Sequence, residues 1–183
     1  VGDTTFQFST IEAFTKSNTG NSIPFVGVDI FEGTFITTRY TVDTSDIDQR
    51  FLLTDNRADT STLIVKVQTS STDSTSTTFT EATDITQVTA GSNVFFLQEV
   101  EAGLFEVYFG DGVIGTALSD DNIVILTYVV SNKTAANGAT LFTNASTIAS
   151  VTDISVATAA TASAGSEPES LSSIKYNAPL DFA

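Results

Sequence analysis

The sequence predicts a mainly β protein, antiparallel and sandwich-like, with one short helix near the C-terminus, and therefore an α+β chain overall. Ser and Thr together make up more than a quarter of the 183 residues. Thr favours pleated, half-exposed surfaces because its branched Cβ restricts χ1. In addition, apolar and polar residues alternate over many short segments, which is the periodicity of half-buried strands.

The first part of the chain is predicted to form six short strands. Glu32-Gly33 is read as a turn between the second and the third of them. The clearest alternation is in "TLIVKVQTS", where Leu63, Val65 and Val67 face one way and the residues between them face the other. The six segments are residues 3–10, 23–33, 33–43, 49–55, 62–70 and 77–82.

Three stronger strands follow, at residues 93–100, 104–110 and 122–131. Ile123 to Val130 is almost continuously apolar. A strand that is covered on both faces has this composition, so we expect a central strand here.

After Ser131 the composition changes to small residues. Residues 132–165 are rich in Ala, Thr and Ser and are predicted to form a connecting segment with an edge strand, for instance "VTDISVATA". Ser166 is a candidate N-cap for a helix that contains Pro168 early and ends at Pro179. We therefore divide the chain into a β-rich domain at 1–131, a connecting segment at 132–165 and a helical segment at 166–183.

Charge and composition exclude several classes of function. The formal net charge of −15 repels phosphate backbones and anionic lipid, so we expect neither nucleic acid nor membrane as a partner. Without Cys or His, the chain lacks a disulfide framework, a thiolate and the usual general base near neutral pH. The chain also lacks Met, and we expect an internal segment of a longer protein.

The stretch "FGDGVIG" contains the pattern G-x-G-x-x-G at Gly110, Gly112 and Gly115. A dinucleotide site needs a helix directly after the glycine turn, and a kinase-type loop needs a Lys on the next strand. Residues 116–130 have a strand pattern and contain neither Lys nor Arg. Asp111-Gly112 is a turn dipeptide, so we interpret the four residues Gly110, Asp111, Gly112 and Gly115 as a structural turn.

Two groups of acidic residues are candidate sites. "DTSDID" resembles the start of a calcium loop, but an EF-hand needs Gly at the sixth position and Glu at the twelfth, where this chain has Asp48 and Thr54. Asp120-Asp121 and the pair Glu99/Glu101 could form a carboxylate dyad, yet the chain has no Trp to stack on a sugar. We assign no catalytic, metal or cofactor-binding residue, and we expect no cofactor and no enzymatic activity.

Several separated blocks of the sequence resemble the baseplate wedge proteins of T-even-like contractile-tailed bacteriophages, within the wider baseplate J-like group. The resemblance spans about residues 30–183 and is strongest at 93–138 and 166–183. The blocks occur in the family's order: "EGTFITTRYTVD", "DQRFLLTDNRADTSTLIVKVQ", "NVFFLQEVEAGLFEVYFGDGVIGTALSDDNIVILTYVVSNKTAANGA" and "SEPESLSSIKYNAPLDFA".

The resemblance implies a virion structural protein of the tail baseplate, made in the cytoplasm of the bacterial host. Its partners would be further copies of itself and other wedge proteins around the tail hub, and the ring would rearrange during attachment and sheath contraction. It also implies that a further domain follows residue 183. The apolar residues Leu171, Ile174, Tyr176 and Pro179 are candidates for an interface, or for packing on that following domain. The alternative function is an extracellular adhesin or a carbohydrate-binding β-sandwich.

Overall fold

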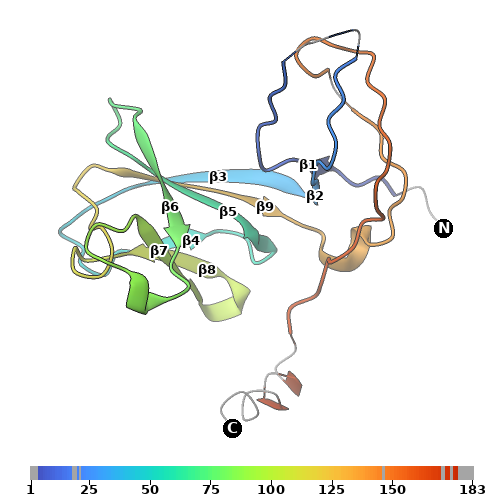
Figure 1. The fold of residues 1–183 in the computed structure, drawn as a ribbon. Helices are drawn as coiled ribbons and strands as arrows, with labels where there is room; N and C mark the ends of the chain where they lie inside the picture. Colours follow the sequence, from blue (N-terminus) through green and yellow to red (C-terminus); the bar gives the residue numbers. More distant parts are fainter. Residues whose placement is uncertain are drawn as a thin grey trace. The chain divides into compact units, whose positions relative to one another are not determined.

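The structure is a computed structural model that describes residues 4–17, 20, 22–145, 147–169, 172–173 and 175–176 (Figure 1). The chain separates into two compact units. The first unit contains residues 1–14 and 29–131, and the second contains residues 15–28 and 132–183. The end of the first unit at Ser131 coincides with the change in composition, whereas segment 15–28 groups with the C-terminal part of the chain.

The first unit is built on one seven-stranded sheet with the order β3-β9-β5-β6-β7-β8-β4. All neighbouring strands are antiparallel except β6 and β7, which are parallel. The strands are β3 (Thr34–Thr41), β4 (Phe51–Leu53), β5 (Ala58–Gln68), β6 (Ser76–Glu81), β7 (Val94–Glu99), β8 (Phe105–Phe109) and β9 (Ile123–Val130). Short 3-10 turns follow β6 at Ile85–Gln87 and β7 at Glu101–Gly103.

The mainly β prediction is confirmed, and the strand expected to be central is central. β9 lies between β3 and β5, with Thr34 opposite Val130 at one end and Thr41 opposite Ile123 at the other. Both faces of β9 carry buried side chains, which explains its unbroken apolar sequence.

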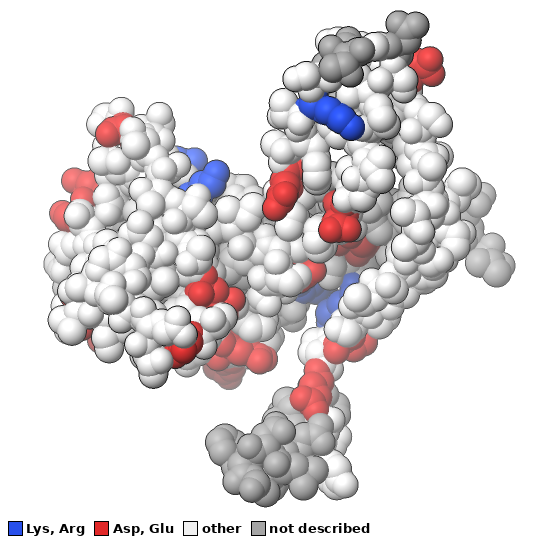
Figure 2. Space-filling model, in the orientation of Figure 1, with Lys and Arg blue, Asp and Glu red and all other residues white. Residues whose placement is uncertain are grey.

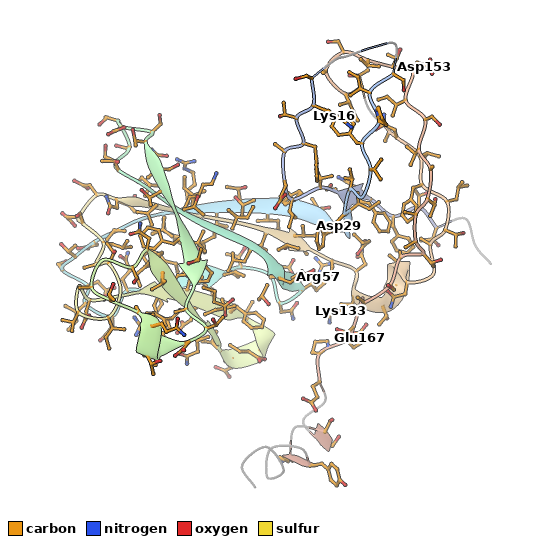
Figure 3. The ribbon with its side chains drawn as sticks, in the orientation of Figure 1. Lys16, Asp29, Arg57, Lys133, Asp153 and Glu167 are labelled. Carbon is orange, nitrogen blue, oxygen red and sulfur yellow. The ribbon has the colours of Figure 1, made fainter. Side chains whose placement is uncertain are left out.

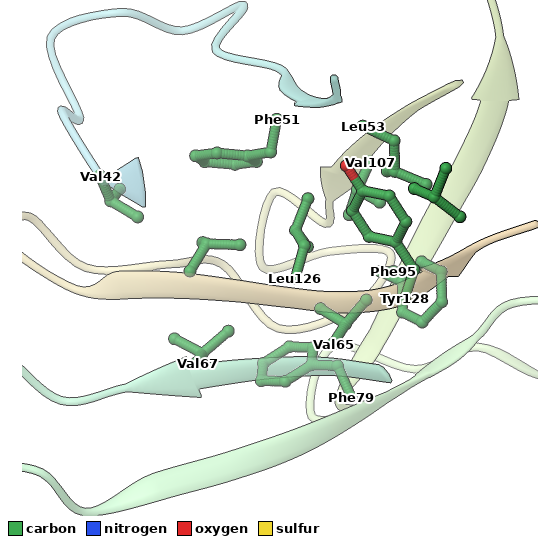
Figure 4. Packing of buried hydrophobic residues seen from close by; sticks show 12 residues of the cluster. Val42, Phe51, Leu53, Val65, Val67, Phe79, Phe95, Val107, Leu126 and Tyr128 are labelled. Atoms are coloured by element: carbon green, nitrogen blue, oxygen red, sulfur yellow. The ribbon is translucent and has the colours of Figure 1, made fainter. Parts of the chain in front are cut away.

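The sheet curls until it is nearly closed, instead of forming the two separate layers of a sandwich. Apolar side chains from both ends of the strand order pack into one core, shown in Figure 4. Among the residues with no solvent exposure are Leu53, Val65, Val107, Leu126 and Tyr128. The core therefore joins β4 and β8 to β5 and β9 through side chains, because these two parts of the sheet are distant in strand order.

A second, two-stranded sheet pairs β1 (Phe8–Ser9) with β2 (Phe31–Glu32). The predicted strands at 3–10 and 23–33 were thus too long, and residues 23–30 have no regular secondary structure. Gly33 does form the expected bend between the second and third segments, with φ 132°. A Cβ at this position would lie 2.3 Å from the carbonyl oxygen of Val130, so only glycine fits.

The second unit has little regular structure, and Figure 1 draws it almost entirely as loops. Beyond the 3-10 turn Lys133–Ala136 and the helical residues 172–173 and 175–176, its described residues contain one isolated bridge, between Ile148 and Val151. The predicted edge strand at 151–159 is therefore wrong. Hydrogen bonds connect Gly138 to Ala162 and Ala162 to Ala139 at 2.8 and 2.9 Å.

Two side-chain contacts hold the ends of this long loop together. The side-chain amide of Asn137 donates to the Gly165 carbonyl at 2.8 Å, and its oxygen accepts from the Gly165 amide at 3.0 Å. Lys133 lies 3.4 Å from Glu167, and the two side chains approach each other in Figure 3.

The predicted helix start at Ser166 is wrong, because residues 166–169 are not helical. Glu167 instead lies in a segment without regular secondary structure, where Lys133 and the Thr134 hydroxyl contact its carboxylate. Residues 172–173 and 175–176 are helical, but the predicted end at Pro179 lies outside the described residues. Within the described part of the chain, no helix is long and apolar enough to cross a membrane.

Candidate functional site

The glycine loop between β8 and β9 is closed by hydrogen bonds among its own residues. Asp111 caps it, because its Oδ1 accepts hydrogen bonds from the amides of Val113 and Ile114 at 2.9 and 3.0 Å. Gly112 and Gly115 have φ of 87° and 84°, in the left-handed region that favours glycine. The loop is therefore an Asx turn closed by two glycines.

Five consecutive backbone amides of this loop already have acceptors within the first unit. Beside the two that donate to Asp111, the Gly112 amide donates to the Gly115 carbonyl at 3.0 Å. The amides of Gly115 and Thr116 donate to the carbonyls of Thr89 and Ser92 at 3.1 and 2.9 Å. A phosphate-binding loop needs these amides free and aimed at the ligand, and here they serve the turn.

The hydrogen bonds of the Gly115 and Thr116 amides attach the loop to the segment that precedes β7. A Cβ at Gly110 would lie 2.1 Å from the Ile114 carbonyl oxygen, and one at Gly115 would lie 3.1 Å from Val94. The close approach of the backbone explains why glycine occupies these positions. Val113 and Ile114 are held at the exposed tip.

The Asp111 carboxylate is stabilised in its ionised form. The amides of Ile114 and then Val113 donate to it, and these bonds lower the pKa of the Asp111 carboxyl below its ordinary value. An anionic carboxylate at the centre of the loop further opposes binding of a phosphate there.

The acidic segment 43–48 folds as a series of turns. Asp43 accepts from the amide and the hydroxyl of Ser45 at 2.9 and 2.6 Å, and Asp46 accepts from the Asp48 amide at 3.2 Å. The Asp120 carboxylate accepts from the Thr44 amide at 3.0 Å. Among the residues that the structure describes, no group of three acidic, His or Cys side chains is arranged to hold a metal ion.

Two shallow depressions open on the first unit. One of about 410 Å³ lies beside the ion pair of Arg57 and Asp55, whose atoms are 2.9 Å apart. The other has a volume of about 330 Å³ and includes Arg39 and Gln68. Neither depression has a signature in the sequence, because its residues come from strands and loops that only the fold brings together.

Of the four candidate interface residues, only Tyr176 is described, and its side chain is 75% exposed. Leu171, Ile174 and Pro179 lie outside the described residues. A larger set of exposed apolar side chains was missed: Ile23, Phe25, Val26, Leu141, Ile148, Val151 and Val156, all in the second unit. The sequence feature that could have predicted this set is a large apolar residue isolated among small polar ones, as at Leu141.

No protein-family model matches the sequence, and no curated protein matches it.

Proposed function

We propose that this protein is a structural component of a contractile-tail baseplate wedge in a bacteriophage virion. It assembles with further copies of itself and with other wedge proteins around the tail hub, and it takes part in the rearrangement on host attachment and sheath contraction. The observation that carries the proposal is the series of ordered sequence blocks, strongest at 93–138 and 166–183, that resemble this family. In this role the chain acts by binding other proteins and uses no cofactor.

The surface of the second unit supports a function in assembly. Its described residues include one buried apolar side chain, Ala136, against eight large apolar side chains that are exposed. Val26 and Leu141 are 88% and 84% exposed. Exposed large apolar groups that lie together are typical of surfaces that bind another protein.

The distribution of charge between the two units also favours an assembly function of the second unit's surface. The second unit contains four of the 22 acidic residues and three of the seven basic ones, so its net charge is −1 and that of the first unit is −14. Covering the second unit therefore buries few charges, and burial of unpaired charges is costly in a protein interface. We infer that the second unit is the assembly surface.

Incorporation of surface variants into virions tests the proposal. Val26→Ser and Leu141→Ser should leave the first unit folded and reduce incorporation of the protein into tails. Ile47→Ser is the matched control, because Ile47 is 89% exposed but belongs to the first unit. Equal incorporation of all three variants would contradict an assembly function of the second unit.

A further inference from the structure

Two cations flank an apolar residue on the outer face of the sheet. Arg39 of β3 is paired with Ile125 of β9, and Ile125 is paired in turn with Lys66 of β5. Residues directly opposite each other in an antiparallel ladder point to the same face. Arg39, Ile125 and Lys66 therefore form a row across three strands, which we call the cationic row.

Arg39 is held in place without being neutralised. Its guanidinium donates to the side-chain oxygen of Gln68 at 2.5 Å, and the Gln68 amide group donates to the Ser70 carbonyl at 2.5 Å. Gln68 is only 7% exposed, so both of its polar groups are fixed by these bonds. A buried neutral amide thus orients the guanidinium and leaves its positive charge unpaired.

The three strands of the cationic row contain few acidic residues, although the chain has a net charge of −15. The strands β3 and β9 contain no Asp or Glu, and β5 contains one, Asp59. In the described part of the chain the ion pairs are Arg50–Glu106, Arg57–Asp55 and Lys133–Glu167, so Arg39 and Lys66 belong to none. In Figure 2, blue atoms over the sheet of the first unit are surrounded by white ones.

Arg39 lines the depression of about 330 Å³, so its charge faces a hollow in which a ligand group can lie. It combines one cation with hydroxyl, amide and apolar groups, and its lining consists of Arg39, Tyr40, Thr41, Gln68, Ser71 and Ile123. A planar guanidinium with free N–H groups matches a carboxylate, which it can bind through two parallel hydrogen bonds.

We propose that the depression and the cationic row bind the carboxylate side chains of an acidic peptide segment from another protein chain. One carboxylate would contact Arg39 and a second would contact Lys66 across Ile125. A polyanion such as nucleic acid fits less well, because the first unit has 18 acidic residues that repel an extended phosphate backbone. The inference concerns the first unit and does not depend on the baseplate assignment.

A titration of the full chain, followed by NMR chemical shifts, tests the inference. The probe is the capped peptide TSDIDQ, which copies residues 44–49 of this chain and places an isoleucine between two carboxylates. We expect shifts at residues 39, 66, 68 and 123. Arg39→Gln should weaken binding about tenfold or more, because a hydrogen bond to a charged group is lost. Replacing both aspartates of the peptide by asparagine should have a similar effect.

Two variants provide the controls. Arg57→Gln removes the same charge at a residue that already has a carboxylate partner, and it should leave the affinity unchanged. Gln68→Glu places a carboxylate beside Arg39, so it should weaken peptide binding as strongly as Arg39→Gln, and it should also lower the thermal midpoint because the donor to the Ser70 carbonyl is lost. Equal affinity of Arg39→Gln and the unmodified chain would overturn the inference. Binding of inorganic phosphate as tight as that of the peptide would overturn it too, because the site would then be a general anion site.

Discussion

The hydroxyl oxygen of Tyr128, in the buried centre of β9, accepts a hydrogen bond from the backbone amide of Thr54 at 3.0 Å. Thr54 directly follows β4, the last strand in the sheet order, whereas β9 is the second. Tyr40 of β3 makes a related contact, because its hydroxyl donates to the Leu52 carbonyl at 2.6 Å. Two tyrosines therefore connect the ends of the nearly closed sheet where no backbone ladder does.

Removal of the Tyr128 hydroxyl should destabilise the first unit. In Tyr128→Phe the amide of Thr54 loses its acceptor in a part-buried position, and we expect a loss of about 1–3 kcal/mol in the free energy of unfolding. Tyr108→Phe is the control, because the Tyr108 ring stacks on Phe96 without a hydrogen bond from its hydroxyl. Urea denaturation measures both variants, and equal losses would refute the closing function of Tyr128.

Truncation of a core side chain should lower the free energy of unfolding more than loss of the Tyr128 hydroxyl does. Leu126 lies on β9 with no exposed surface, and Leu126→Ala should lower the free energy of unfolding by about 2–5 kcal/mol. Val113→Ala at the exposed loop tip should change it by less than about 0.5 kcal/mol. If Leu126→Ala is as mild as Val113→Ala in the same denaturation experiment, the core is not centred on β9.

The glycine loop should not tolerate side chains. Gly115→Ala forces alanine to adopt φ 84° and brings its Cβ 3.1 Å from Val94, so we expect a loss of about 1–2 kcal/mol or more. Gly110→Ala should be worse, because its Cβ would collide with backbone atoms. Gly91→Ala has open space and serves as the control. Stability of Gly110→Ala equal to that of Gly91→Ala would show that the loop is built differently.

The contribution of Asp111 should depend on pH. Because the pKa of Asp111 is lower in the folded chain than in the unfolded one, the ionised carboxylate stabilises the fold above the unfolded-state pKa of about 3.9. This stabilisation is lost as the pH falls through the folded pKa. Asp111→Asn keeps an acceptor oxygen without the charge, so it should be less stable than the unmodified chain at pH 7, and this difference should shrink as the pH falls below the unfolded-state pKa of Asp111. A pH-independent difference between the two would contradict the charge effect.

The second unit should unfold locally, independently of the first unit, when the side-chain hydrogen bonds of Asn137 to Gly165 are removed. Asn137→Ala removes both hydrogen bonds to Gly165, and the amides of Gly138 and Ala162 should exchange with solvent about tenfold faster. Exchange in β9 should not change. Asn56→Ala, at an exposed position of the first unit, is the control for hydrogen-exchange mass spectrometry. Faster exchange throughout β9 in Asn137→Ala would show that the two units unfold together.

Prediction from the sequence succeeded where a local pattern is enough. The segment Ile123–Val130 is almost continuously apolar because β9 is covered on both faces, and the alternation in β5 places Val65 and Val67 in the core. It failed at residues 23–30 and 151–159, where apolar residues occur without a neighbouring strand to pair with. It also failed at Ser166, since the contacts of Glu167 with Lys133 and Thr134 depend on residues more than thirty positions away.

The candidate sites also differ in whether the local sequence is enough to predict them. The turn at Gly110–Gly115 follows from its own residues, because the Asx cap and the left-handed glycines are local features. The cationic row joins three strands and the depression adds residues 40, 41 and 71, so neither has a signature along the chain. Only the register of β3, β9 and β5 brings Arg39 and Lys66 to the same face.

The most direct test of the central claim is to locate the protein on the virion. An antibody against residues 1–131, applied to intact, non-denatured virions and viewed by negative-stain electron microscopy, should label the distal end of the tail before and after induced contraction. Label on fibres, on the capsid or on the host cell surface would contradict the baseplate assignment and favour the adhesin.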